Sequence, residues 1–442
     1  MSSKPVVAVV GRPNVGKSTF FNKIVGRRVS ITDDTPGVTR DRIYAEAEWR
    51  NIRFGLIDTG GIEPDSDELI PSRMREQAQT AMDLADVILF MVDGREGLTS
   101  SDRDVADMLR RTRKKIVLCV NKIDDPAKQT DFYDFYELGI GDPVPISAAN
   151  MLGIGDLLDV IVDDFPEGAG ADDGDEISVA VIGKPNAGKS SLVNALLGEE
   201  RVIVSPIAGT TRDSVDTPLE RDGRRFLLID TAGIRRKSRV SGDIERYSVI
   251  RAVAAIERSD VCILMIDAQD GVTEQDKKIA GLAHEAGKGV MIVVNKWDLV
   301  EKETNTMKKY TDDIRSQLQF LSYAPVMFIS VKTGQRMDGV LRKAAEIADN
   351  RRKRVPTGQL NSLIADAVMM QQTPSDKGKH LRIYYAAQIS TEPPLFSFSV
   401  NRRELMHFSY ARYLENRIRE TFGFEGTSIK FVYKEKRRSE DV

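Results

Sequence analysis

The sequence predicts an α/β protein: two similar domains, each with a mainly parallel sheet and helices on both faces, followed by a small α/β domain. Three observations support this prediction: an internal repeat, apolar runs that alternate with segments of helical period, and a change of charge near residue 351. A chain of 442 residues also needs more than one core, since single cores rarely grow past about 250 residues. We expect a first domain at 1–166, an acidic flexible linker at 167–176, a second domain at 177–350 and a basic domain at 351–442.

The repeat has three parts at a nearly constant offset. GRPNVGKS (11–18) returns as GKPNAGKS after 172 residues, and LIDTGGI (56–62) returns as LIDTAGI at the same offset. NKID (121–124) returns as NKWD after 174 residues. These offsets indicate that a whole domain was duplicated, with small insertions in its loops.

Strand-like and helix-like segments alternate within each copy. In the first copy VVAVV precedes KSTFFNKIV, and VILFMV precedes SDRDVADMLRR. Such apolar runs are typical of strands buried on both faces of a parallel sheet, and ligands of such sheets bind at the carboxyl ends of the strands. Between the copies, residues 163–176 combine acidic residues with Gly, Ala and Pro, which favours a flexible linker. A surface loop of one compact unit is the alternative.

The composition narrows the class of protein. Its hydrophobic and charged fractions are ordinary for a soluble globular protein, and no apolar stretch approaches the roughly 20 residues that cross a bilayer. The first residues run directly into a strand-like segment, without the features of a signal peptide. Cys119 and Cys262 lie in apolar runs and are expected to be core thiols, and the three histidines are too scattered for a metal cluster. We therefore expect a cytoplasmic protein.

Each GxxxxGK[ST] segment predicts a phosphate-binding loop. Glycines let backbone N–H groups turn toward phosphate oxygens at the N-terminus of a helix, where the helix dipole also favours anions. Lys17 and Lys189 would reach the β- and γ-phosphates, and Ser18 and Ser190 would ligate Mg²⁺. Because both copies follow a strand and open a helix, a chance match is negligible.

The DxxG segments also follow apolar strands. Asp58 and Asp230 stand at the strand ends, where a P-loop enzyme places the carboxylate on the Mg²⁺ side. Gly61 and Gly233 would offer a backbone N–H close to the γ-phosphate. An ordinary turn after a strand is the alternative for this pattern.

The NKxD segments predict a preference for guanine. Asp124 and Asp298 can each accept two hydrogen bonds from the adjacent N–H donors of guanine, whereas adenine presents an acceptor there and would leave the carboxylate unpaired. The stems of Lys122 and Lys296 can lie against the base. One such segment alone could be a helix cap, but its distance from the phosphate loop recurs in both copies. The same preference argues against an ATP-driven motor.

Together these segments resemble the motifs of the translation-factor-related GTPases. The fifth motif of those GTPases is similar to SAA (147–149) and SVK (330–332), and their switch threonine matches Thr39 and Thr211. The resemblance implies that this threonine closes on Mg²⁺ and the γ-phosphate and is released after hydrolysis. A simple Ser/Thr-rich loop is the alternative for each segment.

The expected GTP contacts come from these motifs in each copy. In the first copy they are Gly11, Arg12, Pro13, Asn14, Val15, Gly16, Lys17, Ser18, Thr19, Asp58, Thr59, Gly60, Gly61, Ile62, Asn121, Lys122, Asp124, Ser147 and Ala148. In the second copy they are Gly183, Lys184, Pro185, Asn186, Ala187, Gly188, Lys189, Ser190, Ser191, Asp230, Thr231, Ala232, Gly233, Ile234, Asn295, Lys296, Asp298, Ser330, Val331 and Lys332. The expected catalytic residues are Asn14, Lys17, Thr39, Asn186, Lys189 and Thr211. The expected Mg²⁺ ligands are Ser18, Thr39, Asp58, Ser190, Thr211 and Asp230.

Two P-loop GTPase domains followed by a small basic domain resemble the bacterial double-GTPase family Der, also called EngA, over nearly the whole chain. The resemblance implies GTP hydrolysis, a KH-like third domain and a role in assembling the large ribosomal subunit. The implied ligands and partners are GTP or GDP, Mg²⁺, K⁺, ribosomal RNA and the large subunit or its precursor. No membrane and no DNA are expected as partners, and the chain is expected to be a monomer. The competing interpretation is a double GTP sensor that acts as a protein-interaction scaffold with incidental hydrolysis.

The residue after the DxxG glycine departs from many regulatory GTPases. Those enzymes place a glutamine there to orient the attacking water, whereas the first copy has Ile62, which cannot form side-chain hydrogen bonds. In families that this chain resembles, an asparagine at the place of Asn14 and Asn186 helps to bind K⁺, which would neutralise charge in the transition state. The alternatives are an asparagine that only supports the loop, and catalysis by Arg40 or Arg212.

The two copies differ in the segment after DxxG. IEPDSDELIPSR in the first copy is acidic, whereas IRRKSRVSGDIER in the second is strongly basic. We hypothesise that the second segment contacts RNA or an acidic surface and that the first serves another partner or domain arrangement. A solvated charged loop is the alternative. The basic side chains concerned are Arg235, Arg236, Lys237 and Arg239.

The C-terminal part is basic. From residue 351 on it carries 17 Lys+Arg and 10 Asp+Glu, against 47 and 57 before it. Clustered cations attract phosphates, which suits RNA binding. The sequence pattern predicts helix, strand, strand, helix and strand at 358–372, 381–389, 395–401, 403–421 and 427–434.

Two details of this part bear on its core and its loops. Phe396 and Phe398 alternate on one face of a strand and are expected in the core. A GxxG from Gly423 to Gly426 matches the nucleotide clamp of ordinary KH domains, but it follows a helix and precedes a strand, whereas that clamp joins two helices. We therefore expect Gly423 to cap the helix.

Overall fold

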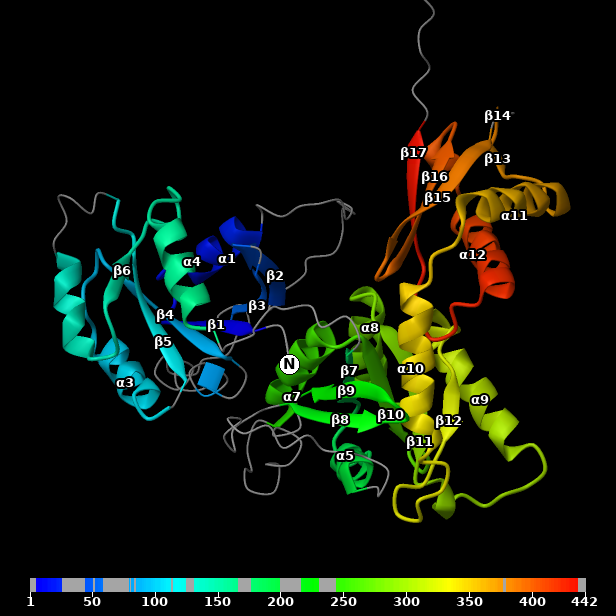
Figure 1. Ribbon diagram of the computed structural model, residues 1–442, viewed down its shortest axis with the longest axis horizontal. Helices are drawn as coiled ribbons and strands as arrows, with labels where there is room; N and C mark the ends of the chain where they lie inside the picture. Colours follow the sequence, from blue (N-terminus) through cyan, green and yellow to red (C-terminus); the bar gives the residue numbers. More distant parts are fainter. Residues whose placement is uncertain are drawn as a thin grey trace, which may run out of the picture. The chain divides into compact units, whose positions relative to one another are not determined.

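The structure is a computed structural model that divides into two compact units (Figure 1). The first unit comprises Met1–Gly174 and Ser241–Ala254, and the second comprises Asp175–Val240 and Ala255–Val442. The second copy of the repeat and the basic C-terminal part therefore belong mostly to the same unit. The residues that the structure describes are 5–25, 44–50, 52–58, 79, 81–82, 85–112, 114–124, 131–165, 176–198, 216–229, 244–376 and 379–435. The predicted linker lies outside them except for Glu176.

The first sheet has six described strands in the order β2-β3-β1-β4-β5-β6 (Figure 1). All neighbours run parallel except β2, which pairs antiparallel with β3 at one edge. The strands are β1 (Val6–Val10), β2 (Tyr44–Trp49), β3 (Ile52–Asp58), β4 (Val87–Asp93), β5 (Lys115–Asn121) and β6 (Pro143–Pro145). The helices are α1 (Lys17–Val25), α3 (Ser100–Leu109), the 3₁₀ helix η2 (Asp131–Leu138) and α4 (Ile154–Asp163).

Alternate side chains of these strands enter two separate cores. Phe20 of α1 and Leu157 of α4 pack with Val7 of β1 on one face. Val105 of α3 packs with Ala8 of β1 on the other. Helices thus cover both faces, which is why all seven residues of β4 are buried.

The second sheet repeats this architecture in the order β12-β11-β10-β7-β9-β8. Its neighbours are parallel except for the antiparallel edge strand β8. The strands are β7 (Glu176–Ile182), β8 (Thr217–Arg221), β9 (Arg224–Ile229), β10 (Val261–Asp267), β11 (Gly289–Asn295) and β12 (Val326–Phe328). The helices are α5 (Lys189–Gly198), α8 (Glu274–Glu285), η3 (Trp297–Leu299), α9 (Thr306–Gln317), η4 (Gln319–Leu321) and α10 (Gly339–Arg352). Helix α7 (Ile244–Arg258) precedes β10, and its residues up to Ala254 belong to the first unit. The α/β fold predicted from the repeat is confirmed.

Helices α3 and α8 begin in the same way. The Thr99 side chain accepts a hydrogen bond from the Asp102 N–H, and the Asp102 carboxylate accepts one from the Thr99 N–H at 3.1 Å. Thr273 and Asp276 form the same reciprocal pair. This capping box satisfies two backbone donors that the first helical turn leaves without partners. Both aspartates are fully buried, so each cap is also part of the domain interior.

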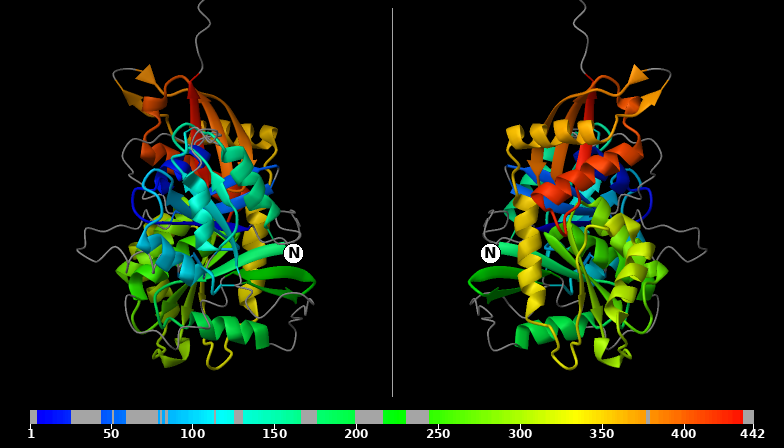
Figure 2. Two further views of the ribbon diagram at one scale, coloured as in Figure 1. Left: turned by 90° about the vertical axis from the view of Figure 1, so that its left-hand side faces the viewer. Right: turned by 90° about the vertical axis from the view of Figure 1, so that its right-hand side faces the viewer.

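The C-terminal part folds as a three-stranded sheet in the order β15-β16-β17, and α11 and α12 lie on one face of it (Figure 2). β15 and β16 are antiparallel, whereas β16 and β17 are parallel. The elements are α11 (Thr357–Met370), β13 (Ser375–Asp376), β14 (Lys379–His380), β15 (Ile383–Thr391), β16 (Pro394–Val400), η5 (Arg403–Leu405), α12 (Phe408–Phe422) and β17 (Lys430–Glu435). The predicted order of elements is confirmed. The last helix begins five residues later than predicted, because η5 and the extended His407 come before it.

Phe396 and Phe398 are fully buried in the core of this part, which confirms the prediction from their alternation. Gly423 ends α12 with φ of +91°, and its N–H donates to the Arg419 carbonyl at 2.8 Å. The glycine is therefore a helix cap, as predicted. Since α12 leads into β17, the GxxG does not join two helices.

The C-terminal part is hydrogen-bonded to the second sheet. The Val290 N–H of β11 donates to the Gly426 carbonyl at 2.7 Å, and the Gly426 N–H donates to the Tyr323 carbonyl at 2.8 Å. Any Cβ at Gly426 would lie 2.4 Å from Ile347 of α10. Arg419 lies over the Tyr323 ring at 4.8 Å. Main chain and side chains together make this junction a packed part of the second unit.

Two expectations from composition can be compared with the described residues. Cys119 and Cys262 are buried free thiols, as predicted, and burial raises the pKa of Cys262 to about 11. Among the described residues no helix has the length and apolar character needed to span a bilayer. Within the ranges that the structure describes, no cluster of three or more His, Cys, Asp or Glu side chains is arranged to hold a metal ion.

Candidate functional site

In both copies a tight loop joins the first strand to the first helix. Asn14 and Asn186 adopt left-handed backbone angles, with φ of +65° and +64°. Gly16 and Gly188 both have φ of +102°, and a Cβ at either would lie 2.2 Å from the side-chain amide of Asn121 or Asn295. Only glycine therefore fits this position, because the loop must approach the asparagine of the NKxD motif closely.

That asparagine holds three motifs together. The Asn121 amide donates to the Val15 carbonyl at 2.8 Å, and its oxygen accepts from the Ala148 N–H at 2.9 Å. In the second copy the Asn295 amide donates to the Ala187 carbonyl at 3.0 Å and accepts from the Val331 N–H at 3.1 Å. The P-loop, NKxD and the fifth motif thus meet at one place in each domain, although they are far apart in the sequence.

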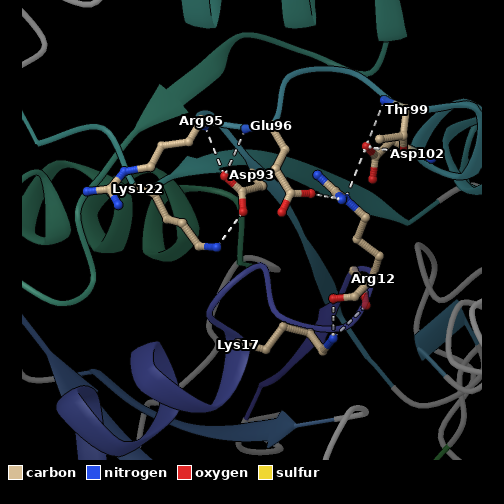
Figure 3. Close-up of polar contacts among 9 residues, drawn as sticks. Arg12, Lys17, Asp93, Arg95, Glu96, Thr99, Asp102 and Lys122 are labelled. Atoms are coloured by element: carbon tan, nitrogen blue, oxygen red, sulfur yellow. Dashed lines mark hydrogen bonds and ion pairs between the residues drawn. The ribbon is translucent and has the colours of Figure 1, made fainter.

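The P-loop lysines lie within their own loops. Lys17 is buried, and its ammonium group donates to the carbonyls of Gly11 at 2.6 Å and Arg12 at 2.8 Å (Figure 3). Lys189 donates to the Gly183 carbonyl at 2.6 Å and to the Lys184 carbonyl. Each loop therefore holds a positive charge beside the N-terminus of α1 or α5, an arrangement that attracts anions.

The predicted Mg²⁺ ligands that the structure describes in the first copy lie together. The Ser18 hydroxyl donates to Asp58 Oδ2 at 3.0 Å, and Asp58 is buried at the end of β3. A hydroxyl and a carboxylate at the mouth of a phosphate loop are hard oxygen donors of the kind that Mg²⁺ prefers. These residues therefore fit the ion. The matching aspartate of the second copy lies outside the described residues.

The lysine of each NKxD motif pairs with an aspartate that sequence reasoning missed. In the first copy Lys122 Nζ lies 2.5 Å from Asp93 Oδ2 (Figure 3). In the second copy Lys296 Nζ lies 2.5 Å from Asp267 Oδ2, and both aspartates end a central strand. Burial opposes ionisation of Asp93, but hydrogen bonds from Lys122 and from two backbone N–H groups outweigh burial and hold the pKa below its ordinary value. The available signal was the repeat itself, because the strand-end aspartates are 174 residues apart.

The second residue of each P-loop is anchored to helix α3 or α8, which the sequence analysis also did not foresee. Arg12 pairs with Glu96, and its Nε lies 3.6 Å from Asp102 Oδ2 (Figure 3). In the second copy the Lys184 N–H donates to Asp276 Oδ1 at 3.1 Å. The buried capping aspartates therefore also support the phosphate loops.

The last aspartate of NKxD lies at the rim of each site. Ser147 donates to Asp124 Oδ1 at 2.7 Å, and this bond together with Arg95 keeps the pKa of Asp124 below its ordinary value. A hydrogen bond from Ser330 lowers the pKa of Asp298 in the same way. Both carboxylates are therefore ionised acceptors at neutral pH.

The structure also places five other predicted site residues. Pro13, Pro185 and Lys332 lie in loops, and Thr19 and Ser191 lie in the first turns of α1 and α5. The switch threonines, most of the DxxG segments, the two neighbouring arginines and the basic segment of the second copy lie outside the described residues. They are Thr39, Arg40, Thr59, Gly60, Gly61, Ile62, Thr211, Arg212, Asp230, Thr231, Ala232, Gly233, Ile234, Arg235, Arg236, Lys237 and Arg239.

Comparison with known proteins identifies both kinds of domain. The family described as "50S ribosome-binding GTPase" matches residues 6–122 and 178–296. The family described as "KH-domain-like of EngA bacterial GTPase enzymes, C-terminal" matches residues 354–434. The basic tail is thus a KH-like domain, as the resemblance implied.

Full-length relatives agree with these matches. GTPase Der of Alkaliphilus oremlandii is 60% identical over 98% of this chain and 99% of its own length. The proteins of the same name from Alkaliphilus metalliredigens and Clostridium tetani are 61% and 58% identical, with the same coverage. A crystal structure of Era in complex with MgGDPNP and nucleotides 1506–1542 of 16S ribosomal RNA matches 60% of this chain and 96% of its own at 21% identity, with a TM-score of 0.31. On the full-length identities and the matched domains, this chain belongs to the GTPase Der family, with two tandem GTPase domains and a C-terminal KH-like domain.

Proposed function

We propose that this protein binds and hydrolyses GTP at two sites, and that the GTP cycle controls its association with ribosomal RNA or ribosomal particles during assembly of the large subunit. One observation carries the two-site proposal: the asparagine bridge between P-loop, NKxD and fifth motif is the same in both copies. A decayed copy would have no reason to keep this geometry.

Guanine recognition is assigned to Asp124 and Asp298. Each is an ionised carboxylate with a serine donor at one side. Guanine offers two adjacent N–H donors to such a carboxylate, and adenine does not. Asp124→Asn or Asp298→Asn should therefore weaken guanosine nucleotides at the altered site, and should favour xanthosine nucleotides because an amide can donate to the 2-oxo group of xanthine.

The phosphates are assigned to the P-loops. Lys17 and Lys189 would exchange their loop carbonyls for phosphate oxygens, and backbone N–H groups of the loops would hold the remaining oxygens. Ser18 and Asp58, with Thr39, and the matching residues of the second copy would hold Mg²⁺. When bound, this ion neutralises charge on the β- and γ-phosphates.

Hydrolysis requires a water oxygen to attack the γ-phosphorus while the bond to the bridging oxygen breaks and charge develops there. Isoleucine after the DxxG glycine supplies no hydrogen bond to that water. We propose that Asn14 and Asn186 help to bind K⁺ beside the phosphates, where the cation stabilises this charge. Both asparagines are exposed in their loops, so their amides are accessible.

The same asparagines also suit the left-handed backbone of the loop, so the test must separate the two roles. Asn14→Gly and Asn186→Gly keep a residue that accepts φ near +65° and remove only the amide. We expect faster turnover in KCl than in NaCl for the unaltered protein, and loss of that difference in the double variant while GDP binding is retained. Equal rates in the two salts would remove K⁺ from the mechanism. If the variant kept the K⁺ dependence, the ion would bind without the two asparagine side chains. Single-turnover rates of Arg40→Ala and Arg212→Ala test the arginine alternative.

The proposed ribosomal partner rests on the family description, "50S ribosome-binding GTPase", and on the basic KH-like domain. Clustered cations give an affinity for RNA that falls with salt. The basic segment after the second DxxG would add to this attraction. We place the activity in the cytoplasm, where the particles are assembled.

Sedimentation of the full-length protein with ribosomal particles tests this proposal. The protein is incubated with purified large and small subunits and with GDP, a non-hydrolysable GTP analogue or no nucleotide. We expect co-sedimentation with the large subunit that depends on the nucleotide and declines with salt. The matched control carries Asp124→Asn and Asp298→Asn, and it should lose the nucleotide dependence. Binding that ignores both nucleotide and salt would favour the protein scaffold with incidental hydrolysis.

A further inference from the structure

The two base-recognising carboxylates differ in the side chains that they hold. Asp124 Oδ1 accepts from Ser147 Oγ at 2.7 Å and from Asn150 Nδ2 at 2.9 Å, and Asp124 Oδ2 accepts from Arg95 Nη2. For Asp298, the side-chain donor among the described residues is Ser330. The serine is common to both sites, and within the part of the chain that the structure describes the other two donors occur at the first site alone.

The difference at the carboxylates comes from two positions in loops whose sequences also differ elsewhere. Arg95 stands where the second copy has Gln269, two residues after the strand-end aspartate. The backbone N–H groups of both donate to that aspartate, at 2.9 Å and 3.0 Å. Asn150 stands where the second copy has Thr333, and both N–H groups donate to the serine hydroxyl, at 3.3 Å and 3.2 Å. These two main-chain hydrogen bonds are thus common to both sites, whereas the side chains at the two positions differ.

The donors on Asp124 compete with a base for the same acceptors. A carboxylate has about four acceptor positions, two on each oxygen. Ser147 and Asn150 use both positions of Oδ1, and Arg95 uses one of Oδ2. Guanine must place one N–H on each oxygen, so it has to displace Asn150 and share or displace Arg95. Ser147 takes only one of the two acceptor positions of Oδ1, so a base N–H can bind beside it once Asn150 has left.

We propose that Arg95 and Asn150, the rim pair, close the guanine-recognising carboxylate of the first site in the absence of nucleotide, and so make that site weaker and more salt-dependent in nucleotide binding than the second. This inference rests on the proposed role of Asp124 and Asp298. Because the Arg95 and Asp124 side chains are 61% and 39% exposed, the charged contact is a surface pair of modest strength. Salt screens it, so higher ionic strength favours the open carboxylate.

The test measures each site separately in the full-length chain. For the first site, the second is silenced by Lys189→Ala and Asp298→Asn, and a fluorescent GDP analogue is titrated at constant K⁺ and at ionic strengths from about 0.05 to about 0.5 M. Arg95→Gln and Asn150→Thr install the residues of the second copy. Each should tighten binding about two- to fivefold, and Arg95→Gln should also reduce the salt dependence.

The matched control is the reverse exchange. With the first site silenced by Lys17→Ala and Asp124→Asn, Gln269→Arg and Thr333→Asn should weaken the second site by a similar factor and give it the salt dependence of the first. The rim pair is refuted if Kd and its salt dependence stay unchanged in all four exchanges while Asp124→Asn still shifts the first site toward xanthosine nucleotides. If Asp124→Asn leaves the guanine preference intact, the proposed base recognition itself has failed.

Discussion

In the first GTPase domain Asn121 joins the P-loop to the fifth motif, and in the second Asn295 does the same with nearly equal distances. At the rims of these sites the likeness ends: Asp124 holds Arg95 and Asn150, which have no counterpart beside Asp298 among the described residues. Replacing a buried side chain that is hydrogen-bonded to the main chain leaves buried polar groups without partners and is costly. Replacing an exposed side chain at the rim changes stability little.

The two domains also differ in the partners of the aspartate that directly precedes a central strand, Asp260 before β10 and Asp86 before β4. In the second, Arg351 of α10 is buried and donates to the Asp260 carbonyl at 2.8 Å and to its carboxylate at 3.2 Å. Asp260 also accepts from the Ser178 N–H at 3.0 Å. In the first domain, Asp86 accepts from the Val6 N–H at 2.7 Å at the equivalent place. The hydrogen bond from a strand N–H to this aspartate is common to both domains. The buried arginine belongs to the domain that is joined to the KH-like part.

The largest expected effect tests whether the two frameworks are equivalent. Gly16→Ala and Gly188→Ala each introduce a Cβ at 2.2 Å from a buried amide, at a φ that disfavours other residues. Displacing that amide breaks two hydrogen bonds, so nucleotide binding at the altered site should weaken at least about 100-fold. Calorimetric titration should then find one guanosine nucleotide per chain for either variant.

Matched controls separate the clash from the backbone angle. Gly97→Ala and Gly271→Ala also have positive φ, of +72° and +67°, but a Cβ at either meets nothing within 4 Å. They should cost only about 1 kcal/mol of stability and keep both nucleotides bound. If one of the two P-loop variants still bound two nucleotides, the two frameworks would not be equivalent.

The next effect concerns the buried arginine of the second domain. Arg351→Met keeps an unbranched apolar stem and removes the charged guanidinium, which leaves Asp260 without this ion-pair partner. We expect a loss of about 2–3 kcal/mol in the unfolding free energy of the second unit, measured by urea titration. Arg224→Met removes an exposed pair with Asp349 in the same domain and should cost less than about 1 kcal/mol. Equal costs would contradict a larger contribution from the buried pair.

Acid should remove the same contribution. Burial opposes ionisation of Asp260, but Arg351 and the Ser178 hydrogen bonds outweigh burial and lower its pKa. A lowered pKa means that the stabilisation is complete above the ordinary aspartate pKa of about 3.9 and is lost as pH falls through the lower folded value. The stability advantage of the unaltered protein over Asp260→Asn should therefore be constant above about pH 5 and shrink below about pH 4. An advantage that persists unchanged at pH 2 would contradict this assignment.

The smallest effect should be the same in both domains. Thr99→Ala and Thr273→Ala each remove a capping hydroxyl from an identical capping box. Each should destabilise its own unit by about 1 kcal/mol, and the serine variants should restore most of the loss because they keep the hydroxyl. A clear difference between the two domains in urea unfolding would show that the contacts of Arg12 and Lys184 with the capping aspartates change the contribution of the two caps to stability.

The sequence predicted the α/β fold, the duplication and the meeting of the motifs, because these features depend on short segments that keep their spacing. Asn121 could be placed beside the P-loop since both follow parallel strands of one sheet. The sequence did not predict the ion pair between Lys122 and Asp93, because an aspartate at a strand end resembles any turn residue.

Contacts made by side chains across the rim were also beyond sequence reasoning. Arg95 and Asp124 are separated by 29 residues, and no periodic pattern relates them. The late start of α12 has a similar origin, since Leu405 is buried in a short 3₁₀ turn where helical propensity alone would have continued the helix. Tertiary packing decided both.

The hydrogen bond from Val290 to Gly426 has a consequence for how this chain can be divided. Val290 lies on β11 two residues before Ile292, whose N–H is satisfied by the Pro325 carbonyl next to β12. Gly426 therefore extends the sheet where β12 has not yet begun, and it packs on Ile347. Cutting the chain after residue 350 would strip an acceptor from an inner strand and uncover apolar surface on α10. The second GTPase domain is thus not a separable module to which a tail has been appended, because the part of the chain after residue 350 completes the hydrogen bonding of β11 and the packing of α10.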